Sequence, residues 1–355
     1  KEIEYLKKKA AVLDLVGESE KAVEDLEKAI KKTKVLRERK WEADCLIALC
    51  KVYFGIAKYN DTIEMAEIAL EIYKELNDKE GEAGGLNCVG IAHWYLGEFK
   101  IALKLYQDSL KIAKKIGNRD LEAMTLGNCS IIFWNLGEYS KSLTYYFRSL
   151  EITKKLGDPE TEGRAFNNIG LIYGTLGENS KALEYYKHSL KITREIGDRK
   201  VEASTLNNIG IIYVTFGEYT KALEYYMGSL KITREIGDRK VEAMTLNNIG
   251  ILYCNIGEYS KALEYCMNSL EISREIRDRQ TETESLVGIG NSYLEIKDLS
   301  NAEEYYNKAF SIAQMIKSKA LFTEVLLSFT SLYFEKNCLV KAKEQLKQVF
   351  SHVDE

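Results

Sequence analysis

Proline is almost absent from the sequence, and Pro159 is the only one in 355 residues. Hydrophobic residues make up 45% of the chain and charged residues 29%, which excludes a disordered or collagen-like chain and is typical of a soluble protein with a large core. No apolar run approaches the roughly 18 residues of a membrane span, and the first residues lack the apolar core of a signal peptide. We therefore expect no membrane partner.

Histidine is scarce too, and the seven cysteines include no CxxC pair. The three histidines lie too far apart for metal-ligand spacing, so we expect no metal and no other cofactor. An odd number of unpaired cysteines suits a reducing compartment, and we expect a cytoplasmic protein. The net charge of −4, without a basic stripe, argues against a nucleic-acid partner. A phosphate loop, a nucleophile elbow and paired carboxylates in a long loop are missing, so we do not expect an enzyme.

One period of 40 residues runs through the chain. The tetrapeptides LGEF, LGEY, LGEN, FGEY and IGEY each start 40 residues after the previous one, at Leu96, Leu136, Leu176, Phe216 and Ile256. Looser versions extend the period in both directions, which indicates a repeat array rather than separate globular domains. We expect a single solenoid over residues 1–355, with repeats at about 1–38, 39–78, 79–118, 119–158, 159–198, 199–238, 239–278, 279–318 and 319–355.

Each repeat has the pattern of two helices, here called A and B. In repeat 199–238, Leu206, Ile209 and Tyr213 recur at helical spacing, and Gly217 is placed to end helix A in a left-handed conformation. Helix B follows, and Asp238 is placed to cap the next A helix. No strand signal appears. The pattern predicts an all-α solenoid of about nine antiparallel helix pairs, which we expect to form a right-handed superhelix whose A helices line a concave groove.

The repeat residues resemble a known family. The residues of repeat 199–238 that resemble the tetratricopeptide repeat signature are Leu206, Ile209, Gly210, Tyr213, Gly217, Tyr219, Ala222 and Tyr226. The 40-residue form is similar to Pins-type polarity adaptors, kinesin light chains and sensor arrays of prokaryotic signal-transduction ATPases. This resemblance implies a protein- or peptide-binding scaffold rather than an enzyme.

Pairs of adjacent amides lie off the apolar stripe of the A helices. A carboxamide offers one acceptor and two donors, which suits the backbone of an extended peptide. We expect a groove-lining ladder, although asparagines can instead bond to neighbouring helices. Repeat 119–158 carries Gly127 at the first amide position. The candidate ladder residues are Asn87, Asn128, Asn167, Asn168, Asn207, Asn208, Asn247 and Asn248.

The resemblance assigns a backbone-gripping role to the second amide of each pair. It applies to Asn128, Asn168, Asn208 and Asn248. Three residues further on, where Pins-type grooves carry another amide, this chain has apolar side chains, which we include in the expected contact surface. They are Ile131, Leu171, Ile211 and Ile251.

Aromatic residues lie one turn beyond the ladder in the second to fourth repeats. We expect Phe54, Trp94, Tyr95 and Trp134 to form anchors for a partner, because tryptophan and tyrosine dominate interface energies. Packing between repeats is the alternative role for these rings.

Three functions fit the sequence. The first is a scaffold whose groove captures an extended peptide or partner segment. The second is a ligand-sensing array of a larger ATPase, cyclase, kinase or transcription regulator. The third is a structural solenoid that self-associates through its terminal repeats. The chain begins at Lys1 rather than methionine, so we expect a fragment of a longer protein.

Overall fold

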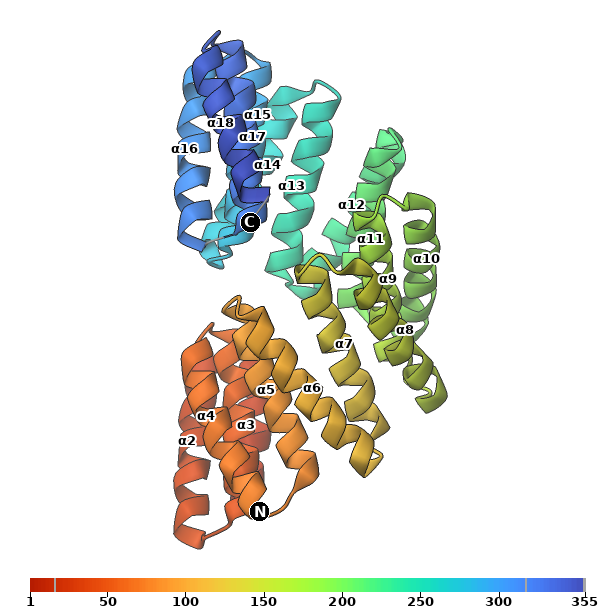
Figure 1. The fold of residues 1–355 in the computed structure, drawn as a ribbon, viewed down its shortest axis with the longest axis vertical. Coiled ribbons are helices and arrows are strands. Elements are labelled where there is room, and N and C mark those ends of the chain that lie inside the picture. The colour runs from red at the N-terminus through yellow and green to blue at the C-terminus, as the bar shows by residue number, and fades with distance from the viewer. Residues whose placement is uncertain (16, 317, 354–355) are drawn as a thin grey trace. The chain divides into compact units, whose positions relative to one another are not determined.

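A computed structural model describes residues 1–15, 17–316 and 318–353, and all regular structure in that part of the chain is helical (Figure 1). The chain divides into two compact units, Lys1–Gly177 and Glu178–Glu355. The division falls inside repeat 159–198, between its A and B helices. The helices of the N-terminal unit are α1 (Glu2–Leu15), α2 (Ser19–Leu36), α3 (Arg39–Gly55), α4 (Tyr59–Glu75), α5 (Lys79–Tyr95), α6 (Phe99–Ile116), α7 (Arg119–Asn135), α8 (Tyr139–Leu156) and α9 (Pro159–Thr175).

The C-terminal unit continues the same alternation. Its helices are α10 (Asn179–Ile196), α11 (Arg199–Thr215), α12 (Tyr219–Ile236), α13 (Arg239–Asn255), α14 (Tyr259–Glu275), α15 (Arg279–Glu295), α16 (Leu299–Ile316), α17 (Lys319–Glu335) and α18 (Leu339–Val353). Odd-numbered helices are A helices and even-numbered helices are B helices. The predicted all-α solenoid of antiparallel helix pairs is confirmed. None of the described helices is both long and apolar enough to cross a membrane.

Glycine and aspartate set the helix ends where the sequence predicts them. Gly217, just after α11, has φ 73°, and Gly237, which ends α12, has φ 71°. Both values lie in the left-handed region that a residue with a side chain adopts less easily. Asp238 then accepts a hydrogen bond from the Val241 backbone N–H at 3.1 Å and caps α13. Pro159 occupies the first turn of α9, where a missing N–H costs little.

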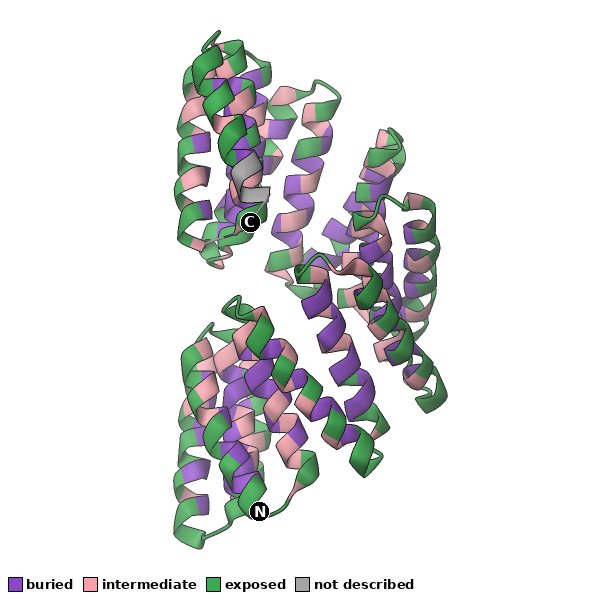
Figure 2. Ribbon diagram, in the orientation of Figure 1, coloured by how far each residue is buried: buried purple, intermediate pink, exposed green. Residues whose placement is uncertain are grey.

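The A helices form the inner layer of each unit. Consecutive A helices contact one another from α1 to α7 and from α11 to α17, whereas consecutive B helices make no comparable contact in the described part of the chain. Buried residues follow the A helices on several sides, as Figure 2 shows for α7 and α13. Closer spacing of the A helices curves each unit so that they lie on its concave side.

Small residues allow the helices of one repeat to pack closely. Gly210 of α11 lies against the ring of Tyr226 of α12, which is 2% exposed. A Cβ atom at Gly210 would lie 2.4 Å from the nearest Tyr226 ring carbon, which is well inside van der Waals contact. The tyrosine ring fills the space of the missing side chain.

Gly210→Ala is expected to lower the free energy of unfolding by about 2 kcal/mol, because the overpacking cost exceeds the gain in helix propensity. Gly228→Ala on α12 is the matched control, since its Cβ would make an ordinary 3.5 Å contact with Leu206. The control is expected to raise stability by about 0.5–1 kcal/mol. Urea unfolding followed by circular dichroism distinguishes the two, and equal effects would contradict the close packing.

A buried glutamate ties neighbouring repeats together. Glu242 of α13 is 5% exposed and accepts hydrogen bonds from Arg234 Nε at 3.0 Å and Arg239 Nη1 at 2.7 Å. Arg239 also reaches Glu275 Oε2 on α14 at 2.7 Å. One arginine comes from the end of the preceding B helix and the other from the start of the same A helix. Equivalent arrangements surround Glu202 and Glu282.

Candidate binding site

The first amide is buried in three of the four repeats that carry it. Asn87, Asn207 and Asn247 are 2%, 2% and 3% exposed. The Asn87 Nδ2 group donates to Ser109 Oγ and to Thr125 Oγ1, both at 2.8 Å, and so joins α5 to α6 and α7. Such satisfied buried amides act between helices.

This burial corrects part of the predicted ladder. Asn87, Asn207 and Asn247 are placed in the groove by the sequence, but their amides are enclosed by protein and are not available to a ligand. The serine and threonine residues that bond to the first amides also recur in the sequence. Serine recurs on the B helices every 40 residues, and threonine recurs two residues before the first amide position.

The second amides lie half-buried on the inner layer, and two of them are held by a first amide. The Asn128 Nδ2 group donates to Asn87 Oδ1 at 3.3 Å, and the Asn248 Nδ2 group donates to Asn207 Oδ1 at 3.0 Å. Each of these bonds runs from one repeat to the preceding one. Asn168 instead hydrogen-bonds to the Tyr146 hydroxyl on α8, and burial raises the pKa of that tyrosine.

Asn167 and Asn208 are also half-buried, and neither lacks a partner within the protein. Asn208 stands at the place of Asn128 and Asn248 in its own repeat. Asn167 stands at the place of the buried first amides but is less enclosed than they are.

The apolar row beside the ladder is accessible. Leu171, Ile211 and Ile251 are 36%, 39% and 38% exposed, and Ile131 is half-buried. Each side chain follows a second amide by three residues, so it lies on nearly the same face of its A helix. The inner layer therefore presents amides and apolar side chains together.

Three of the four predicted aromatic anchors meet in one cluster. The Tyr95 ring centroid lies 4.7 Å from that of Trp94 and 6.2 Å from that of Phe54, and Tyr95 is 51% exposed. Sequence reasoning missed Tyr59 of α4, whose ring stacks on Tyr95 at 4.8 Å. Trp134 is half-buried one repeat further along, and its indole nitrogen is buried without a hydrogen-bond partner.

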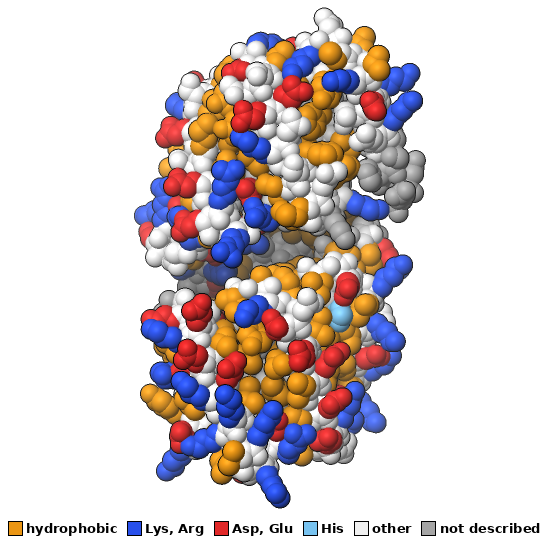
Figure 3. All heavy atoms as spheres, turned by 90° about the vertical axis from the view of Figure 1, so that its left-hand side faces the viewer, with side chains coloured by type: hydrophobic (Ala, Val, Ile, Leu, Met, Phe, Trp, Pro, Cys, Tyr) orange, Lys and Arg blue, Asp and Glu red, His pale blue; other side chains and the backbone are white. Residues whose placement is uncertain are grey.

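Hydrophobic side chains gather on the surface of the N-terminal unit (Figure 3). Figure 3 shows a face of this unit where they cluster among lysine, arginine, aspartate and glutamate side chains of both signs. Exposed apolar surface of this kind is a feature of sites that bind other molecules.

A cavity of about 420 Å³ lies between α7 and α9. Three predicted site residues, Asn128, Ile131 and Asn168, line it together with Met124 and with Tyr146 from α8. The helices α7 and α9 make fewer close approaches than the other consecutive A helices of this unit. Sequence reasoning did not anticipate this opening.

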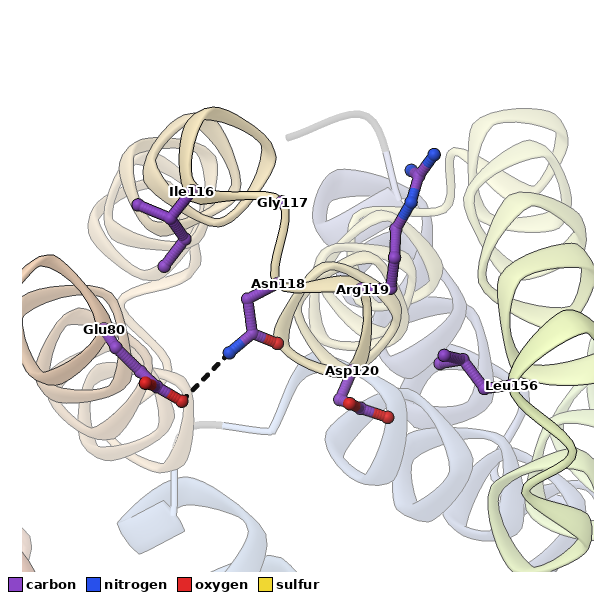
Figure 4. Close-up of a pocket in the computed structure, with 7 residues that line it drawn as sticks. All are labelled: Glu80, Ile116, Gly117, Asn118, Arg119, Asp120 and Leu156. Carbon is purple, nitrogen blue, oxygen red and sulfur yellow. Dashed lines mark hydrogen bonds between the residues drawn. The ribbon is translucent and has the colours of Figure 1, made fainter.

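A second hollow of about 570 Å³ lies at the turn between α6 and α7 (Figure 4). Its polar groups have partners. Asn118 accepts from the Leu121 backbone N–H and donates from Nδ2 to Glu80 Oε1, both at 3.0 Å, while Arg119 points away from this pair. We interpret Asn118 as a helix cap that links two repeats.

One carboxyl group on the inner layer of the C-terminal unit is unusually basic. Burial raises the pKa of Glu284 on α15 to about 7, and the negative charges of Glu324 and Asp278 add to the effect. A 3.1 Å hydrogen bond from Gln280 Nε2 opposes the effect of burial, and the charge of Lys240 does so to a smaller extent. Glu284 occupies the repeat position that Met124 holds beside the cavity.

The repeat residues that build this geometry match a family model over residues 82–155, 161–235 and 241–315, more than half of the chain, and the model is described as tetratricopeptide repeat. The chain belongs to the tetratricopeptide repeat family. A comparison of this chain with curated protein sequences found no match.

Solved tetratricopeptide-type structures share the fold at low sequence identity. A Rap protein complexed with Competence and Sporulation Factor is 15% identical with a TM-score of 0.69, and the match covers 99% of this chain and 98% of that one. The apo quorum sensor NprR from B. thuringiensis is 14% identical with a TM-score of 0.70 and the same coverage. A signal-transduction ATPase from Pyrococcus horikoshii with a tetratricopeptide repeat sensor is 20% identical with a TM-score of 0.60. That match covers 94% of this chain and 51% of the ATPase.

Proposed function

We propose that this tetratricopeptide repeat chain is a scaffold that binds an extended peptide or partner segment on its inner layer. The observation that carries the proposal is the pairing of amides between repeats. The buried first amide of Asn87 holds the half-buried second amide of Asn128, and Asn207 holds Asn248 in the same way. Apolar side chains lie beside the second amides and supply a surface for ligand side chains.

The amide pairing prepares the second amide for a peptide backbone. Asn128 uses one N–H in its bond to Asn87, so its carbonyl oxygen and second N–H remain for a backbone N–H and C=O. The bond fixes the side chain before binding. Less side-chain entropy is then lost when the peptide is captured, and the ligand bears most of the ordering cost.

Anchoring side chains would supply most of the affinity. A net hydrogen bond contributes only about 0.5–1.5 kcal/mol, so amides alone give register rather than tight binding. Two surfaces offer apolar contact area. One is the exposed ring of Tyr95, which has Trp94 and Phe54 against it, and the other is the apolar row beside the second amides. Aromatic anchors of this kind dominate binding energies.

The relatives support a binding role. The Rap structure is of a complex with Competence and Sporulation Factor, and NprR is a quorum sensor. Both match this chain over nearly their whole length.

The test uses a random nonapeptide library displayed on phage and selected on the immobilised chain. We expect enriched peptides whose affinity falls at least about fivefold in Asn128→Ala and in Asn248→Ala, because each change removes one or both backbone hydrogen bonds of its amide. Fluorescence anisotropy with the synthetic peptides measures the change. Asn307→Ala, on the exposed side of α16, is the matched control and should bind normally. Failure to enrich any peptide, or unchanged affinity in both ladder variants, would contradict the proposal.

A sensing array is the second candidate. The observation that favours it is the similarity to the ATPase with a tetratricopeptide repeat sensor, of which this chain spans about half. The sequence of the full-length protein decides between the two. An adjoining ATPase, cyclase, kinase or DNA-binding segment supports a sensor, and its absence from the full-length protein favours an adaptor.

A further inference from the structure

The A helix α7 lacks the first amide and carries glycine in its place. Gly127 of α7 stands where four other repeats carry asparagine, and Ala165 of α9 stands where three repeats carry threonine. Asn87 of repeat 79–118 shows what these residues do. Its amide donates to the hydroxyl of Ser109 on the B helix and to that of Thr125 on the next A helix, and so joins three helices. At the contact between α7 and α9 the amide and the threonine of this bridge are therefore both missing, and only the serine, Ser149, remains.

Packing does not require glycine at position 127. A Cβ atom there would approach nothing closer than the Tyr146 ring and Ser149 Oγ, both at 4.0 Å. At Gly90 of the preceding A helix, by contrast, a Cβ atom would lie 2.5 Å from the Tyr106 ring. Gly127 thus leaves open space where the other glycine is needed for close contact.

The open space is the cavity between α7 and α9. Its volume of about 420 Å³ falls within the range of ligand-binding pockets, roughly 300–1,000 Å³. Tyr146 and Ser149 of α8 form its floor, and Asn128 and Asn168 line it from α7 and α9. The cavity is large enough for a bulky side chain, and two second amides stand beside it.

The lining favours an apolar occupant. The Ser149 hydroxyl already donates to the Ala123 carbonyl oxygen at 2.7 Å, and the Tyr146 hydroxyl is hydrogen-bonded by Asn168. Met124 and Ile131 provide apolar wall, with Ala165 in place of a hydroxyl-bearing threonine. Asp120, Asp158 and Arg164 also line the cavity, beside this apolar wall. Beside Met124, Ile131 and Ala165 a polar side chain would lose water without gaining a matched partner, whereas an apolar one would not.

We propose that this cavity is the anchor pocket for one large apolar side chain, leucine, isoleucine, methionine or phenylalanine, of an extended peptide. Asn128 and Asn168 hold the peptide backbone on either side of the anchor. The inference rests on the proposed scaffold function and adds where the peptide is fixed and which side chain fixes it. Gly127 is the residue that creates the specificity.

The test compares the same nonapeptide library on three proteins. Wild type should enrich peptides with a large apolar residue at one fixed position, and Gly127→Asn should show no such preference. Gly127→Asn restores the residue of the other repeats and places its amide toward Ser149 Oγ, as Asn87 reaches Ser109 Oγ, so the fold is expected to persist. Circular dichroism and thermal melting check it. Gly127→Ala is the matched control, because a methyl group leaves most of the cavity open.

A peptide selected on wild type should bind Gly127→Asn at least about tenfold more weakly, since the buried anchor contact is lost, and Gly127→Ala within about threefold. Enriched peptides without a fixed apolar position, or equal binding by Gly127→Asn, would overturn the anchor pocket while leaving the scaffold function intact. No enrichment on wild type would overturn the scaffold function and the pocket with it.

Discussion

Glu242→Ala is expected to lower the free energy of unfolding by about 3 kcal/mol. The carboxylate is 5% exposed and bonded to Arg234 and Arg239. Removing one partner of a buried ion pair costs about 3–5 kcal/mol. The lower end applies because both arginines are about half exposed and can be hydrated once the glutamate is gone.

Urea unfolding at neutral pH measures the effect. The matched control is Glu304→Ala, which removes an exposed glutamate that pairs only with Lys308, one helical turn away on α16. The control should change stability by less than about 0.5 kcal/mol. A change below about 1 kcal/mol in Glu242→Ala would show that the arginine cluster is not a structural link between repeats.

Glu284→Gln is expected to have the opposite sign, raising the free energy of unfolding by about 3 kcal/mol at pH 8. The pKa of Glu284 is raised from 4.5 to about 7 in the folded chain. Between these values the unfolded chain has lost the proton that the folded chain keeps, so stability falls as pH rises and the loss is complete above pH 7. Each unit of pKa corresponds to about 1.4 kcal/mol. Glutamine carries no charge to bury and removes the penalty.

Stability of wild type and Glu284→Gln measured from pH 5 to pH 8 gives the sign directly. The difference should grow from about 1 kcal/mol near pH 5 to about 3 kcal/mol at pH 8. Glu304→Gln, on the exposed face of α16, should show no such growth. A difference that stays constant across the range would mean that Glu284 is ionised normally in the folded chain.

These two glutamates show that burial alone does not set the effect of a carboxylate. Glu242 has two arginines within hydrogen-bonding distance, whereas Glu284 has one neutral hydrogen-bond donor and more negative than positive charge nearby. Both lie on A helices of the same unit. We therefore expect the first carboxylate to stabilise the helix stack and the second to destabilise it at neutral pH.

The helix pairs could be predicted from the sequence because their signals are local. Glycine after most A helices and aspartate before most of the following ones are read from single positions, and both act through the backbone of their own turn. The division of the chain after Gly177 depends on packing between helices and has no such local signal.

The ladder was predicted only in part. Adjacent asparagines point about 100° apart on a helix, and the sequence pattern places both off the apolar stripe. Only the packed helices show that Asn207 is enclosed while Asn208 lies nearer the surface. The serine and threonine residues that hydrogen-bond to the first amide can be recognised only once the helices are stacked.

The cavity was not predicted because it results from an absent side chain. Gly127 is visible in the sequence. Beside most other A-helix glycines of this chain, however, a tyrosine ring or another side chain fills the space that a Cβ atom would take. Only the distance of Tyr146 from position 127 shows that nothing occupies the space. The aromatic partner Tyr59 was missed for a related reason, since it comes from a B helix rather than from the groove helices.

The central claim is that second amides such as Asn128 hold a peptide backbone. The direct measurement is a double-mutant cycle on a selected nonapeptide, combining Asn128→Ala with an ester in place of each peptide amide in turn. Our account predicts that at one position the two changes together cost no more affinity than Asn128→Ala alone, because the ester removes a hydrogen bond that the alanine has already removed. Losses that add fully at every position would contradict it.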